Sequence, residues 1–114
     1  MKMSKIIFFG YMFIILIMSL IPGDTLADVE MLYWDKIIHF IEYFIFGVLG
    51  IKAFSNLKYS VYFIIFFGTS FGFFNEVLQN LIPGRSPSIY DALANFFGVT
   101  FGTITSLVNK KYIK

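Results

Sequence analysis

Four apolar stretches run along the chain, and each is close to the length that a helix needs to cross a lipid bilayer. A hydrocarbon core of about 30 Å takes roughly 20 apolar residues in helical form. The pattern predicts helices over residues 6–21, 37–54, 59–82 and 89–108. We therefore expect a single domain over residues 1–114, an all-α membrane protein with four transmembrane helices in an antiparallel bundle.

The breaks between the stretches carry residues that favour turns, at positions 22–24, 55–56 and 83–88. The last two links are short, so the helices that they join should be antiparallel neighbours. Gly98 and Gly102 lie four residues apart in the last stretch, and small residues at this spacing let two helices approach closely.

The first stretch has a second interpretation. Lys2 and Lys5, the apolar run and the small residues at positions 25–27 also fit a secretory signal peptide with its cleavage site. The next segment would begin outside the cell in either case, so the expected topology of the later helices is the same.

Composition indicates that lipid is the main solvent of the chain. The 114 residues are 58% hydrophobic and 14% charged, whereas soluble domains have about 25% charged residues. The sequence contains no Cys, which excludes disulfides, thiol catalysis and Cys-based zinc sites, and a single His is too few for a His-rich metal site. The basic residues are short flanks of apolar stretches rather than a folded basic domain, so we expect no nucleic-acid partner.

The charges divide between the two ends of the expected bundle. Seven of the nine basic residues lie near the N-terminus, in the link between the second and third stretches, and near the C-terminus. All seven acidic residues lie on the opposite side, where only Lys36 and Arg85 accompany them. Because cytoplasmic loops are enriched in Lys and Arg, we predict that both termini are cytoplasmic.

Polar side chains converge on the acidic end from three predicted helices and one loop. Asp35, His39 and Tyr43 are spaced four residues apart and share one helix stripe. The other polar residues expected at this level are Lys36, Glu76, Gln79, Arg85, Ser88, Asp91 and Asn95. Ionisable groups at membrane depth are costly unless they are paired or face water, so they indicate a functional site.

Simpler roles are also open to several of these residues. Asp35 and Ser88 would cap the starts of their helices, since Asp and Ser accept hydrogen bonds from the unpaired N–H groups there. His39 would serve as a packing residue. Glu76 and Asp91 would form a structural ion network with the loop arginine, without any ligand.

The ordered set of residues resembles the VanZ-like family of small bacterial membrane proteins. The family pattern reads approximately D-K-x-x-H-x-x-x-Y, then E-x-x-Q, then P-G-R with S-x-x-D-x-x-x-N-x-x-G. The matching residues are Asp35, Lys36, His39, Tyr43, Glu76, Gln79, Pro83, Gly84, Arg85, Ser88, Asp91, Asn95, Gly98 and Gly102. The resemblance covers about residues 19–102 and implies a multi-pass protein of the bacterial cytoplasmic (inner) membrane. The family is named after a protein linked to resistance to the glycopeptide antibiotic teicoplanin, which implies action near the cell envelope.

The function that we expect is binding of an anionic lipid-linked envelope group at an outer-leaflet polar site. Arg85 offers a planar fork suited to phosphate or carboxylate, and Lys36 and His39 would add donors. Glu76 and Asp91 would hold Arg85 or His39 in place. Gln79, Asn95 and Tyr43 would complete a hydrogen-bonded floor, and Asp35 and Ser88 are the other candidate binding residues.

Three alternatives stay open. The chain would be an enzyme acting on an envelope lipid or glycan, with His39, Glu76 and Asp91 as candidate catalytic residues and His39 as general acid or base. It would be a structural or accessory subunit, or a proton-coupled carrier, which is less favoured because the ionisable groups stop at about Glu76. We assign no metal and no cofactor, although carboxylates gathered in this way could hold a divalent cation. The expected partners are membrane lipids, a lipid-linked envelope precursor, and either a second copy or a larger membrane protein.

Overall fold

The computed structural model describes residues 3–20, 29–81 and 89–112, and it describes side-chain surroundings for residues 3–20, 36–81 and 89–108. Within these residues the chain forms four helices and no strand. The helices are α1 (Met3–Ser19), α2 (Val29–Phe54), α3 (Ser60–Gln79) and α4 (Ile89–Tyr112). The all-α prediction is therefore confirmed for the described part of the chain.

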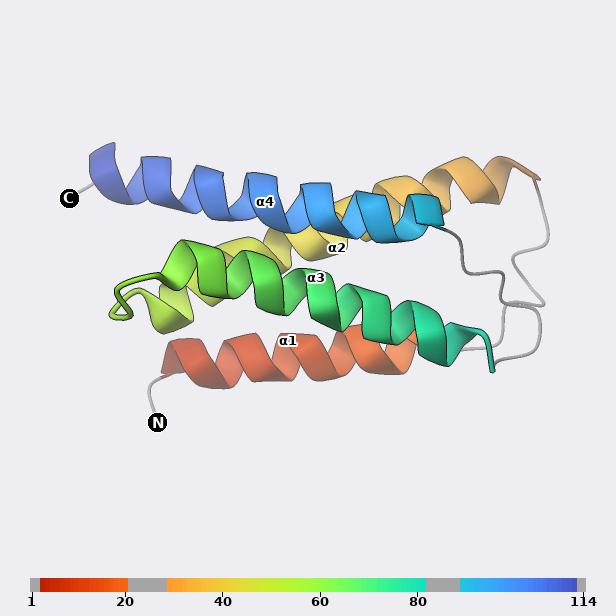
Figure 1. Ribbon diagram of the computed structural model, residues 1–114, viewed down its shortest axis with the longest axis horizontal. Helices are drawn as coiled ribbons and strands as arrows, with labels where there is room; N and C mark the ends of the chain where they lie inside the picture. The colour runs from red at the N-terminus through yellow and green to blue at the C-terminus, as the bar shows by residue number, and fades with distance from the viewer. Residues whose placement is uncertain (1–2, 21–28, 82–88, 113–114) are drawn as a thin grey trace.

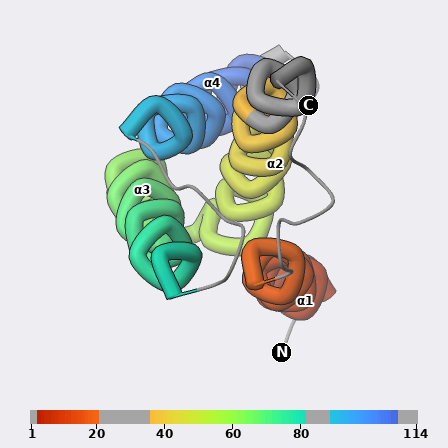
Figure 2. The backbone as a smooth tube through the Cα atoms, turned by 90° about the vertical axis from the view of Figure 1, so that its right-hand side faces the viewer, coloured from red at the N-terminus to blue at the C-terminus, as the bar shows by residue number. Residues whose placement is uncertain are grey.

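Successive helices run in opposite directions, so that α1 begins and α4 ends at the same end of the bundle (Figure 1). Seen end-on in Figure 2, α2 lies between α1 and α4, and α3 lies on the other side of the bundle. The most extensive contact joins α2 to α4, and α2 also packs against α1 and α3.

Three of the helices are long and apolar enough to cross a membrane, over Lys36–Phe54, Ser60–Gln79 and Ile89–Val108. The fourth, α1, is a shorter apolar helix of 17 residues. Large apolar side chains such as Phe66 point outward and are largely exposed. Contiguous exposed apolar surface on a protein marks a region that another apolar phase covers, so the outer surface fits a lipid environment.

The start of α2 differs from the prediction. The helix begins at Val29, eight residues before the expected start at residue 37. Asp35 therefore lies six residues inside the helix, and the capping role suggested for it was wrong. The physical reason is that residues 29–36 contain neither Pro nor Gly, so nothing in this mixed polar and apolar segment interrupts a helix.

Glycines bring α2 and α4 into backbone contact. A Cβ atom at Gly98 would collide with the carbonyl oxygen of Phe40, and one at Gly102 would collide with that of Phe44. Gly47 of α2 faces the α4 backbone in the same way. The close approach predicted from Gly98 and Gly102 is thus present, and its partner is α2.

An aromatic core supports the polar end from within. Phe46 is fully buried, and its ring packs edge-on against Phe8 with the ring centroids 4.9 Å apart. The same ring stacks against Tyr43 and Phe71. Because edge-on and offset-stacked rings fix one another's orientation, this cluster sets the position of the Tyr43 side chain.

Replacing Gly102 by Ala should destabilise the protein by about 1–3 kcal/mol, because the added methyl group meets main-chain atoms that cannot rotate away. Unfolding of the purified protein in detergent measures this change. Gly10→Ala is the matched control, because a Cβ there has no neighbouring atom within 4 Å. Equal stability of the two variants would show that the α2–α4 contact is not as close as described.

Candidate functional site

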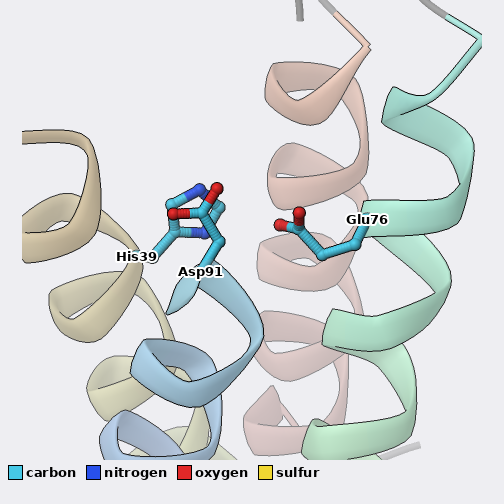
Figure 3. Close-up of side chains that lie close together, drawn as sticks. All are labelled: His39, Glu76 and Asp91. Carbon is cyan, nitrogen blue, oxygen red and sulfur yellow. The ribbon is translucent and has the colours of Figure 1, made fainter. Parts of the chain in front are cut away.

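Three ionisable side chains from three helices meet at the end of the bundle where α3 ends and α4 begins. His39 comes from α2, Glu76 from α3 and Asp91 from α4, and all three are buried. One nitrogen or oxygen atom of each lies within 4.8 Å of the corresponding atoms of the other two. Figure 3 shows the Glu76 carboxylate reaching from α3 toward the His39 ring and the Asp91 carboxylate.

A salt bridge links α2 to α4 at the edge of this group. The Lys36 ammonium lies 3.3 Å from a carboxylate oxygen of Asp91. The Asp91 side chain is buried, whereas that of Lys36 is 37% exposed. The positive charge therefore faces the surface at the polar end while its carboxylate partner lies inside.

The orientation of the His39 ring is set by Asn95. The ring Nδ1 lies 3.0 Å from the Asn95 amide oxygen. Because an amide oxygen only accepts hydrogen bonds, Nδ1 is the donor in this contact. Gly72 on α3 makes room for the amide, since a Cβ there would lie 2.9 Å from the Asn95 Nδ2 atom.

A second hydrogen-bond network lies beside this group and joins three helices. The Asn75 amide donates to the Tyr43 hydroxyl at 3.0 Å, and its oxygen accepts a longer bond of 3.4 Å from Ser19. Sequence reasoning assigned Tyr43 to the site but did not include Asn75 or Ser19. The available signal was an amide in the middle of an apolar stretch, where an unsatisfied polar group is costly.

Two buried amide donors at this end have no hydrogen-bond partner among the described residues. They are Nε2 of Gln79 and Nδ2 of Asn95, on side chains only 3% and 1% exposed. Unsatisfied donors of this kind cost about 1–3 kcal/mol each when buried. Both amide nitrogens therefore keep the capacity to donate one further hydrogen bond.

The described part of the site contains seven of the ten residues predicted from the sequence. They are Lys36, His39, Tyr43, Glu76, Gln79, Asp91 and Asn95, and all lie in the described parts of α2, α3 and α4. The side-chain surroundings of Asp35 lie outside the described residues, and so do Arg85 and Ser88. Their place in the site therefore stays a prediction.

The fold and this cluster define a class of protein: a small helical bundle of membrane-protein composition that holds a buried ionisable site at one end. The sequence model of the VanZ/LLP1 family matches residues 3–109, and the chain belongs to this family. A search of curated proteins gave no match, and a search of solved structures gave none.

Proposed function

We propose that this VanZ-family protein binds the phosphate-bearing head group of an anionic lipid-linked envelope molecule at the polar end of its bundle. The site would lie at the outer leaflet of the bacterial cytoplasmic membrane. The observation that carries the proposal is the meeting of an ammonium group and buried amide donors beside the group formed by His39, Glu76 and Asp91.

The donors suit an oxyanion that approaches from the membrane surface. Lys36 supplies a partly exposed positive charge, and Asp91 holds that charge at a fixed place. Hydrogen bonds from charged donors to anionic oxygens are about twice as strong as those between neutral groups. Gln79 and Asn95 add neutral donors that are buried.

The surface around these donors suits the apolar part of a lipid. Leu81, Ile89 and Tyr90 lie at the same end of the bundle and are 78%, 72% and 65% exposed. Acyl or isoprenoid chains would cover these side chains while the head group enters the polar site. Binding of an envelope precursor would connect the site to glycopeptide resistance, the role that the family name implies.

A second candidate is an enzyme that acts on the same head group. The observation that favours it is the fixed ring of His39, buried beside two carboxylates with Asn95 setting its orientation. General acid–base catalysis needs such a positioned ring within reach of the reacting group. Product formed by the wild type and not by His39→Ala would favour this candidate over binding alone.

The proposed location of the site requires that both termini are cytoplasmic. Because the sequence contains no Cys, single Cys substitutions can test this requirement. Leu81→Cys, at the polar end, should react with a membrane-impermeant maleimide on intact spheroplasts. Asn56→Cys, in the exposed turn between α2 and α3, should react only after the membrane is permeabilised. The reverse labelling pattern would place the site on the cytoplasmic side and contradict the proposal.

Lys36→Ala should weaken binding of phosphatidic acid by about 10–100-fold, because it removes a charge-assisted contact worth about 1.5–3 kcal/mol. Native mass spectrometry of the purified protein in detergent measures this binding, with phosphatidylcholine as the lipid that lacks a net negative charge. Lys36→Arg should retain most of the affinity.

Lys52→Ala is the matched control, because Lys52 is an exposed lysine at the opposite end of the same helix. An equal loss of affinity in Lys36→Ala and Lys52→Ala would show that lipid binds through general surface charge. Unchanged affinity in Lys36→Ala would also reject the proposed site.

A further inference from the structure

We propose that His39, Glu76 and Asp91 together hold a divalent transition-metal ion, with Zn²⁺ the ion that best matches the donors. This inference rests on the proposed function, because the ion would be the part of the site that binds the phosphate oxygens of the head group. It departs from the assignment made from sequence, which included no metal.

The geometry of the three side chains fits three protein ligands of one ion. Zinc binds imidazole nitrogen and carboxylate oxygen at about 2.0–2.2 Å, so tetrahedral ligand atoms lie about 3.3–3.6 Å apart. The candidate ligand atoms lie within 4.8 Å of one another. Closure by about 1–1.5 Å brings them to that spacing, and it is within reach of rotation about the long Glu76 side chain.

The hydrogen bond between His39 and Asn95 is a second observation that indicates metal binding. Histidines that bind metals through one ring nitrogen almost always donate the other N–H to a carboxylate, a carbonyl or water, which fixes the tautomer. Here Nδ1 donates to the Asn95 amide oxygen at 3.0 Å. We assign Nε2 as the nitrogen that would bind the ion, because an imidazole binds a metal through its unprotonated nitrogen.

The charges of the described side chains favour a cation at this position. Two carboxyl groups, from Asp91 and Glu76, lie close together beside the His39 ring, and Lys36 contacts only the one from Asp91. Carboxylates that share a site repel one another, and a divalent cation between them would reduce that repulsion. The same cation would attract the phosphate oxygens of the head group.

The buried amides complete the argument for a ligand beside the ion. Gln79 Nε2 and Asn95 Nδ2 are buried donors with no hydrogen-bond partner in the part of the chain that the structure describes. Asn95 contacts the candidate ligand His39 directly, and Gln79 lies one helical turn from Glu76 on the same face. With three protein ligands the ion keeps a fourth position for a phosphate oxygen, and these donors suit the oxygens around it.

Metal content of the purified full chain tests the inference. The protein is prepared without a polyhistidine tag, stripped with a chelator, incubated with Zn²⁺ or Mg²⁺ and passed through a gel-filtration column. Elemental analysis should find about one zinc per wild-type chain and no retained Mg²⁺, and less than about a tenth of that zinc in His39→Ala and Glu76→Gln. Zinc in the wild type no higher than in Glu76→Gln would overturn the inference.

Glu42→Gln is the matched control, since it also removes a carboxylate from the bundle but lies outside the three-residue group. It should retain the wild-type zinc content, and an equal loss of zinc there would reject the specific site. A second experiment uses the wild type alone and so does not depend on the folding of any variant.

X-ray absorption of the zinc-loaded wild type should show one imidazole ligand and otherwise oxygen ligands. A shell of oxygen ligands without imidazole would overturn the assignment.

Lipid binding by the stripped protein separates this inference from the proposed function. Phosphatidic acid binding that persists without metal and is lost in Lys36→Ala would overturn the metal inference and keep the proposed function. Zinc binding with no change in phosphatidic acid affinity, and no effect of Lys36→Ala, would keep the metal site and overturn the proposed function. We expect removal of zinc to lower the affinity at least about tenfold, the loss that follows from removing one strong electrostatic contact.

Discussion

The contact between α2 and α4 determines the geometry of the polar site. Helices whose contacts carry larger side chains lie 8–10 Å apart, whereas Gly98 and Gly102 let the main chains of these two helices meet. This contact fixes their register, so that His39 lies opposite Asn95 and Lys36 lies opposite Asp91. In lipid, where apolar side chains gain little by leaving the solvent, close packing of this kind is a main source of helix association.

The third helix adds the second carboxylate, from Glu76, and the amides of Asn75 and Gln79. Gly72 allows α3 to approach the Asn95 side chain, and Glu76 follows one turn later on the same face. Asn75 then joins α3 to Tyr43 on α2. Polar groups at this depth are costly when unsatisfied, so the hydrogen bonds that hold the helices together also restrict how the site can rearrange. Stability and site geometry therefore depend on the same side chains.

Sequence reasoning reached the parts of this arrangement that depend on pattern alone. The length of the four apolar stretches predicted the helices, and the four-residue spacing of Gly98 and Gly102 predicted a close helix contact. The start of α2 was not predicted, because residues 29–36 contain no Pro or Gly to mark a helix boundary. Sequence reasoning also missed the hydrogen bonds that join Asn75 to Tyr43 and to Ser19. Those contacts depend on how each helix is rotated about its axis relative to its neighbours, which the spacing within one helix does not determine.

The convergence of three helices on His39 is the central claim, and the chain contains a single His, so one isotope label reports on it. Solid-state NMR in lipid bilayers can measure dipolar couplings from the ¹⁵N-labelled imidazole to ¹³C-labelled side-chain carbons of Asn, Asp and Glu. A nitrogen-to-oxygen distance of 3.0 Å places the Asn95 amide carbon about 4 Å from the ring nitrogen. The account predicts clear dephasing from the Asn carbon and weaker dephasing from both kinds of carboxylate. Full retention of the imidazole signal in all three labelled samples would show that these helices do not bring their polar side chains together.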